Sequence, residues 1–305
     1  CCAIVRAGFA SCGEWGMSWV GSRSSGATLV AAAAVLWSTG GLFVRALDID
    51  LWTMLAWRSL FAALALAVVV AARHRAGTIG ALRRMGRPGL AAIPIALVSM
   101  TSFVVAVKLT TVANVMIVYA TVPFLAAGIS YLWIGERPNR RVLAASAFAF
   151  IGIALMAGAA PRWQDVAGNA VALLMSVAFA VQLVMARRYP GLAMAPVNGA
   201  GAALCALVFF PLASSVIPSV YELFVLMLFG IATTAGAYVL FLIGGRYIPS
   251  GEAGLIGMLD VVLSPLWVWW LFDERPSHAA LIGGVLVLGA VVWYLGAQRR
   301  AARAA

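Results

Sequence analysis

Long apolar segments separated by short polar or proline-containing breaks constrain this chain more than any other feature. Each segment has roughly 20 residues, the length that a helix needs to cross the hydrocarbon core of a bilayer. Only helices are credible spans, because every backbone polar group in lipid must be paired within its own segment. The sequence therefore predicts an all-α integral membrane protein with ten transmembrane helices at residues 28–46, 52–72, 89–107, 111–134, 141–160, 166–186, 193–213, 221–243, 250–272 and 279–297.

Lipid is also the solvent that the composition suits. The chain is 64% apolar and 10% charged, with a mean hydropathy of +1.01, whereas a soluble domain carries about 25% charged residues. Ten spans and their loops leave no room for a sizeable soluble domain in 305 residues. The lipid bilayer is therefore the first predicted partner.

The net charge of +11 indicates topology rather than nucleic-acid binding. With a cytoplasmic N-terminus and alternating helices, 16 of the 21 basic residues fall on the cytoplasmic side and 4 on the other. The remaining one, Arg58, lies within a span. Positive residues favour the cytoplasmic side, so both termini are expected in the cytoplasm. The many Ala and Arg residues favour a bacterial source, and hence the inner (cytoplasmic) membrane.

One stretch of the chain occurs twice, at residues 109–138 and 247–276. Each copy follows a basic residue, contains an internal proline and ends in Glu-Arg-Pro, with an offset of 138 residues between Pro138 and Pro276. Five helices per half is an odd number, so the second half enters the membrane from the opposite side. The sequence therefore predicts an inverted repeat, the symmetry that gives many transporters their inward-open and outward-open states.

The predicted domains follow from this repeat. They are a cytoplasmic N-terminal tail at 1–27, a first repeat at 28–160, a second at 161–297 and a basic cytoplasmic tail at 298–305. Met17 is an alternative start, and on that interpretation residues 1–16 are not native. A weaker echo relates the segment from Trp37 to the one from Phe179.

Several motifs that would indicate an enzyme or a pump are missing. The four cysteines and two histidines form no CxxC pair or other metal-ligand pattern, so we expect no metal and no cofactor. There is no GxxxxGK[ST] motif for ATP binding and no HExxH or GxSxG motif for hydrolysis. These gaps argue against an ATP-driven pump and against the usual intramembrane hydrolases.

The repeated stretch resembles the EamA branch of the drug/metabolite transporter superfamily. In that family a helix enters through small residues, carries a proline near its middle and ends in an acidic residue. The first copy matches with Thr111-Val112-Ala113-Asn114, Pro123 and Glu136, and the second with Gly251-Glu252-Ala253, Leu259-Asp260, Pro265 and Glu274. The second copy departs from the commonest form, because Val261 stands where a proline is usual. The resemblance implies a ten-helix transporter and says little about substrate, since members move amino acids, nucleosides, sugars and amines.

Asp260 is the first candidate for binding. It lies about ten residues into a predicted span, where an acid costs roughly 2.5–3.5 kcal/mol. It shares a helical face with Gly257, Ser264 and Trp267, which suits a cavity wall. The functional interpretation is a site for a substrate amine or for protons. The alternative is a structural acid bonded to a neighbouring helix.

Arg58 is the second charged candidate. It lies about 9 Å below the start of its span at 1.5 Å per residue. One interpretation is a site for an anionic group on the substrate. The alternatives are that its side chain snorkels to the outer surface, or that it pairs with Asp48 or Asp50.

Polar and aromatic residues within spans complete the candidate site. Asn114, Tyr119 and Thr121 lie on or near one face of the span at 111–134, and Gln182 is a mid-span amide. Such groups line a cavity or bond between helices. Trp37, Tyr238 and Trp267 can stack on a substrate, although aromatic residues in spans more often pack or face lipid.

The leading functional hypothesis is a secondary transporter for a small metabolite, with an amino acid or related amine as the best guess and export as the direction. The substrate would lie between the two repeats against Asp260, and access would alternate, with protons as a candidate coupling ion. The rivals are a membrane-embedded enzyme for a lipid-linked substrate and a passive channel. The sequence leaves the oligomeric state open.

Overall fold

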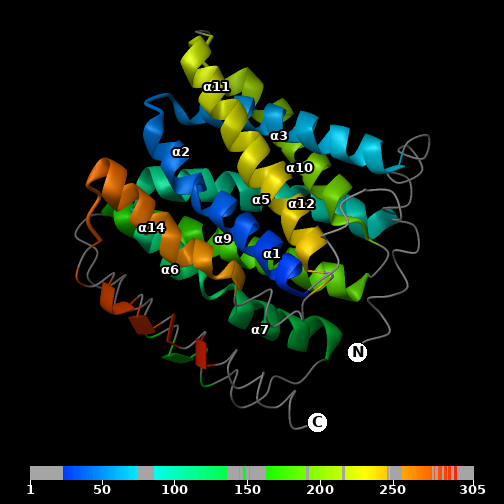
Figure 1. The fold of residues 1–305 in the computed structure, drawn as a ribbon, viewed down its shortest axis with the longest axis vertical. Helices are drawn as coiled ribbons and strands as arrows, with labels where there is room; N and C mark the ends of the chain where they lie inside the picture. Colours follow the sequence, from blue (N-terminus) through cyan, green and yellow to red (C-terminus); the bar gives the residue numbers. More distant parts are fainter. Residues whose placement is uncertain are drawn as a thin grey trace.

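The computed structural model describes residues 23–74, 86–135, 163–189, 192–214, 217–245 and 256–276, with shorter pieces at 144, 147–148, 151, 247, 278, 281–283, 285–286, 288–289 and 292–293. All regular structure in these residues is helical (Figure 1). The elements are α1 (Arg23–Ser38), α2 (Gly40–Ala46), α3 (Leu51–His74), α5 (Gly86–Leu109), α6 (Val112–Tyr119), α7 (Val122–Ile134), α9 (Trp163–Arg188), α10 (Met194–Phe209), η2 (Phe210–Leu212), α11 (Val220–Phe229), η3 (Gly230–Gly236), α12 (Ala237–Gly244) and α14 (Leu259–Phe272).

Seven stretches of the described chain are long and apolar enough to cross a membrane, by length and composition. They match the predicted spans one to four and six to eight. These stretches are Ser24–Ala46, Leu51–Ala72, Gly86–Leu109, Val112–Ile134, Asp165–Ala186, Met194–Leu212 and Val220–Phe241. The ninth predicted span contains α14, a shorter apolar helix. The predicted spans 141–160 and 279–297 lie mostly outside the described residues, so ten helices stay a prediction, whereas the all-helical class is confirmed over the described part.

Two of the predicted spans are interrupted by a turn. The span at 111–134 consists of α6 and α7, with a turn at Ala120 and Thr121 between them. Pro123 lies in the first turn of α7, where a missing backbone N–H costs nothing. The span at 28–46 breaks in the same way at Thr39, between α1 and α2. Both predicted spans are therefore present, each as two helices joined by a turn.

A third irregularity lies inside the span Val220–Phe241. Residues Gly230–Gly236 form a π-helical segment between α11 and α12. The Thr233 hydroxyl donates to the Phe229 carbonyl oxygen at 2.7 Å. A Cβ at Gly230 would clash with the Arg58 carbonyl oxygen and lie 2.9 Å from Ala62 N, so this glycine allows η3 to touch the α3 backbone. π-Helical segments are rare and frequent at functional sites.

The contacts between helices form a closed ring in which each helix packs against the next. The order around the ring is α1, α14, α6, α9, α5, α10, α3 and η3, which continues into α12 and returns to α1. Elements from before residue 160 alternate with elements from after it. The main buried cluster accordingly draws on both halves of the sequence, from Val44 to Val268.

Candidate functional site

A cavity of about 180 Å³ lies inside this ring, and every helix of the ring contributes to its wall. The volume slightly exceeds that of an engineered apolar cavity of about 150 Å³ that binds benzene, so it suits a small molecule. The lining residues are Trp37, Gly40, Arg58, Ser99, Met100, Phe103, Met116, Tyr119, Met175, Phe179, Gln182, Asn198, Phe229, Thr233, Thr234, Tyr238 and Asp260.

Most of the residues predicted from the sequence meet at this cavity. Six of the nine candidates line it: Trp37, Arg58, Tyr119, Gln182, Tyr238 and Asp260. They come from α1, α3, α6, α9, α12 and α14, which are spread over more than 200 positions of the chain. The structure thus brings together residues that share no local motif.

Asp260 lies in the first turn of α14 with only 6% of its surface exposed. Its Oδ1 atom has no hydrogen-bond partner among the described residues. The same helix is held to α1, because the Ser264 hydroxyl donates to the Ser38 carbonyl oxygen at 2.7 Å and Trp267 Nε1 donates to Ser38 Oγ at 2.9 Å. The helix that carries this carboxylate is therefore held in position, and Oδ1 can accept a hydrogen bond from a ligand.

Arg58 lies on α3 and is 5% exposed. Its guanidinium carbon lies 4.5 Å from the centre of the Phe229 ring, a cation–π distance. Nη1 donates a long hydrogen bond of 3.4 Å to the Met100 carbonyl oxygen, and Nε has no partner among the described residues. Because the side chain is buried, the structure does not show the alternative in which it snorkels to the surface.

The alternative pairing of Arg58 with Asp48 or Asp50 is also absent from the described salt bridges. Asp50 instead lies immediately before α3, and its Oδ2 accepts a hydrogen bond from Thr53 N in the first turn of that helix at 2.9 Å. Partial burial disfavours the charged form of Asp50, but hydrogen bonds from Thr53 and Trp52 outweigh this and lower its pKa.

Three candidates lie away from the cavity lining. Asn114 donates to Thr110 Oγ1 at 3.0 Å, and the Thr121 hydroxyl donates to the Val118 carbonyl oxygen at 2.6 Å. Trp267 Nε1 donates to Ser38 Oγ on α1. The bonds of Asn114 and Thr121 are local, to residues four and three positions earlier in the chain, and not the bonds between helices that the sequence left open. Asn114 Oδ1 has no hydrogen-bond partner among the described residues.

Several lining residues were not among the predicted candidates. Asn198, Thr233 and Thr234 are polar residues inside spans, and this signal alone would have found them. Phe179 had a second signal, because the weak repeat pairs it with Trp37 and both line the cavity. The methionines Met100, Met116 and Met175 carried no signal, because apolar residues are expected throughout a span.

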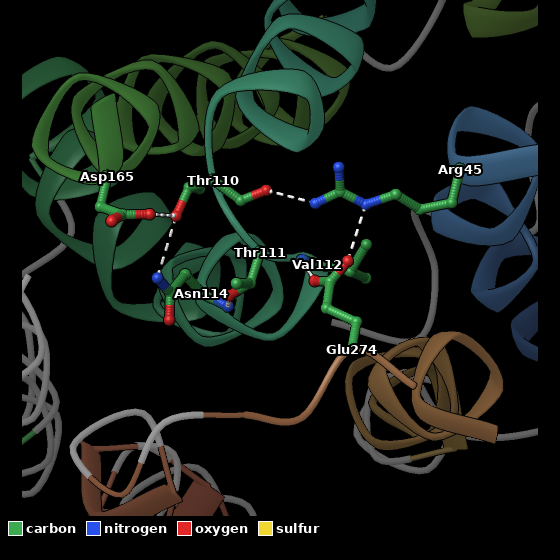
Figure 2. Close-up of polar contacts among 7 residues, drawn as sticks. All are labelled: Arg45, Thr110, Thr111, Val112, Asn114, Asp165 and Glu274. Atoms are coloured by element: carbon green, nitrogen blue, oxygen red, sulfur yellow. Dashed lines mark hydrogen bonds and ion pairs between the residues drawn. The ribbon is translucent and has the colours of Figure 1, made fainter. Parts of the chain in front are cut away.

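A polar junction at the start of α6 joins four parts of the chain (Figure 2). Arg45 at the end of α2 donates from Nη2 to the Thr110 carbonyl oxygen at 2.7 Å. Its Nε lies 2.7 Å from Glu274 Oε2. The two groups form an ion pair, but the angles at these atoms do not fit a hydrogen bond. Glu274 Oε1 accepts from Val112 N at 2.8 Å, so this carboxylate caps α6.

The junction extends to α9, because Thr110 Oγ1 donates to Asp165 Oδ1 at 3.0 Å. Arg275, the neighbour of Glu274 in the chain, does not join the junction but pairs with Asp273 at 3.2 Å on the surface. Among the described residues no group of three or more His, Cys, Asp or Glu side chains is placed to hold a metal ion.

Comparison with known proteins identifies the family. The model of the EamA-like transporter family matches residues 24–158 and again residues 166–296. The chain belongs to the EamA-like transporter family. This family is part of the drug/metabolite transporter superfamily, so the resemblance found in the sequence is confirmed.

Two individual relatives agree with this membership. The chain is similar to an uncharacterized transporter of Archaeoglobus fulgidus, with 24% identity over 282 residues that cover 90% of this chain and 98% of the relative. It also resembles a protein of known crystal structure, with 25% identity and a TM-score of 0.61 over 88% of this chain and 96% of the other. The EamA-like protein described here is thus a multi-pass membrane transporter, not an enzyme.

Proposed function

We propose that this EamA-like protein is a secondary transporter that exports a small amine-bearing metabolite, an amino acid or a related amine, by alternating access. The observation that supports this most is the cavity itself. It is walled by alternating helices from the two halves of the chain and contains Asp260, a buried carboxylate with an unpartnered oxygen. Secondary transporters commonly bind substrate between repeats, near the midplane and beside interrupted helices.

Asp260 is the proposed site for the substrate ammonium and for a coupled proton. An ionisable residue within a span is a functional candidate because its burial is costly. Tyr119 and Gln182 supply further polar groups on the cavity wall, while Trp37 and Tyr238 supply aromatic faces. The α1–α2 break, the α6–α7 break and η3 all adjoin residues of this wall, so they are the proposed hinges.

The two family matches, at residues 24–158 and 166–296, support two repeated halves. We propose that these halves, at 28–160 and 161–297, are inverted relative to each other in the inner membrane with both termini in the cytoplasm, as the distribution of basic residues favours. In this arrangement Arg45, Thr110, Asp165 and Glu274 lie at the outer end. Their junction would hold that end closed in one state and would separate in the other.

Counterflow in proteoliposomes tests this function. Vesicles preloaded with unlabelled amino acids or amines should take up the labelled compound faster than empty vesicles, whereas a passive channel gives no such stimulation. Asp260→Asn should abolish the stimulated uptake, and Asp273→Asn, at an exposed surface pair, should leave it unchanged. Normal transport by Asp260→Asn at every pH tested would contradict the assigned role of Asp260.

A further inference from the structure

The cavity contains two opposite charges that do not neutralise each other. Arg58 and Asp260 both line it, and their side chains are 5% and 6% exposed. The salt bridges of the described residues include neither of them. Each also keeps a polar atom without a partner among the residues that the structure describes, Nε on Arg58 and Oδ1 on Asp260.

Such an arrangement is costly unless something compensates both charges. A buried charge needs a partner or good hydrogen bonds to offset its loss of hydration. For Arg58 the described protein supplies only the Phe229 ring and one long hydrogen bond from Nη1 to Met100. A direct ion pair with Asp260 would be the simplest compensation, but the salt bridges of the described residues do not include one.

Both charges are also held in place rather than free to swing together. Gly230 brings η3 against the backbone of α3 at Arg58, and Phe229 packs under the guanidinium. Asp260 is mounted on α14, which Ser264 and Trp267 tie to α1. The two charges therefore lie on different helices, and each helix is held by its own contacts. A ligand that binds both charges has to reach from one side chain to the other.

Apolar groups make up most of the cavity wall beside the two charges. Met100, Met116, Met175, Phe103 and Phe179 all line the cavity. Methionine side chains adapt to the shape of a ligand and make favourable contacts with apolar groups. This wall offers no third charge among the lining residues, so it suits an uncharged, apolar body.

We propose that the substrate is a zwitterion with an apolar body, whose carboxylate binds Arg58 and whose ammonium binds Asp260. Arg58 is then the residue that separates amino acids from simple amines. This inference rests on the proposed transport function and deepens it. A guanidinium presents donors in a fork that matches a carboxylate, and a ligand with both charges satisfies the unpartnered atoms at both ends.

A set of leucine analogues tests the two charges separately in the wild-type protein. Labelled leucine is exchanged in proteoliposomes, and competitors are leucine, 3-methylbutylamine, 4-methylpentanoate and leucine methyl ester. The amine and the ester lack the negative charge, and the acid lacks the positive one. We expect leucine to compete at least about tenfold better than each of the other three, because each leaves one buried charge unpaired.

Variants assign each charge to its residue. In Arg58→Gln, leucine should lose at least about tenfold in apparent affinity while 3-methylbutylamine keeps its wild-type value. In Asp260→Asn the pattern should reverse, with 4-methylpentanoate unaffected. Arg58→Lys keeps the charge and should fall between wild type and Arg58→Gln. If a variant does not fold, the wild-type competition series decides alone.

The outcomes separate this inference from the transport function. If 3-methylbutylamine exchanges and competes as well as leucine, the zwitterion inference is overturned while an amine transporter using Asp260 stands. If 4-methylpentanoate exchanges and competes as well as leucine, both the zwitterion inference and the assigned role of Asp260 are overturned. If the wild-type protein exchanges neither leucine nor any analogue, the inference and the proposed amine-bearing substrate fail together.

Discussion

At the scale of single residues, the Ser38 carbonyl oxygen shows how one hydrogen bond supports the site. This carbonyl lies at the break between α1 and α2 and accepts a hydrogen bond from the Ser264 hydroxyl at 2.7 Å. Ser264→Ala would remove this buried hydrogen bond, which costs about 0.5–1.5 kcal/mol. We expect a lower melting temperature in detergent and weaker substrate binding, because the bond also positions α14 and Asp260.

Ser130 provides a matched control on another helix. It is 3% exposed, and its hydroxyl has no partner among the described residues. Ser130→Ala removes an unsatisfied polar group rather than a bond, so its melting temperature should stay the same or rise. Equal losses in both variants would show that the Ser264–Ser38 bond contributes nothing specific.

The polar residues of the spans also show what sequence alone can settle. A buried acid or amide in a membrane helix must be satisfied or used, so Asp260 and Gln182 stood out without a structure. The same logic nominated Asn114, yet its amide donates to Thr110 within one turn of the chain. Polarity identifies residues that need a partner, but only the packing of α6 shows which partner is taken.

At the scale of elements, the contact between η3 and α3 connects fold stability to the site. A Cβ added at Gly230 would clash with the Arg58 carbonyl oxygen and would lie 2.9 Å from the backbone nitrogen of Ala62. Gly230→Ala would push η3 away from α3, and such overpacking costs about 1–3 kcal/mol. We expect a lower melting temperature together with a loss of counterflow, since Arg58 and Phe229 move with these two elements.

Gly128 in α7 offers the comparison for this substitution. A Cβ at Gly128 would meet nothing within 4 Å, so only helix propensity changes. Gly128→Ala should therefore keep full transport and should stabilise the protein by about 0.5–1 kcal/mol. Wild-type stability and transport in Gly230→Ala would mean that α3 and η3 adjust freely, contrary to the close packing.

The junction at the start of α6 gives the second prediction for elements. Glu274→Gln keeps an acceptor for Val112 N but removes the charge that attracts Arg45 and favours the helix N-terminus (Figure 2). Because this junction ties α14 to α2 and α6, we expect a loss of about 1–3 kcal/mol, measured as a fall in melting temperature. Transport should change as well, because the proposed closed state is weakened.

Asp273 lies next to Glu274 in the sequence and is the natural control. Its ion pair with Arg275 is exposed, with 78% and 77% of the two side chains accessible, and exposed pairs contribute little. Asp273 has a φ of +50°, a conformation that asparagine also tolerates. Asp273→Asn should thus match the wild type. A Glu274→Gln protein as stable as Asp273→Asn would contradict a structural junction.

The helix interruptions divide into those that sequence reveals and those that it hides. Pro123, a residue that commonly interrupts helices, lies just after the α6–α7 break. The η3 segment contains no proline, and its sequence Gly-Ile-Ala-Thr-Thr-Ala-Gly reads as an ordinary membrane helix. Its π geometry accompanies close packing on α3, and such tertiary causes leave no local pattern.

At the scale of the whole molecule, the alternating ring explains why neither half can form the cavity alone. Each ring helix from one half is flanked by helices of the other half, so a movement between halves changes the cavity on all sides. The sequence predicted two halves from the repeated Glu-Arg-Pro stretches. It did not predict their interleaving, which depends on contacts between helices far apart in the chain.

The inverted orientation of the halves makes a prediction that needs no substrate. Glu136-Arg137-Pro138 and Glu274-Arg275-Pro276 end the two copies of the repeat. In an inverted pair these ends face opposite sides of the membrane, and in a parallel pair they face the same side.

Arg137→Cys and Arg275→Cys would each be placed in a background without the four native cysteines. A membrane-impermeant maleimide should label Arg275→Cys in intact cells and Arg137→Cys only in opened cells. A background that retains Cys205, which is buried, should react only after denaturation. Labelling of both new cysteines from one side would rule out the inversion and the ten-helix topology with it.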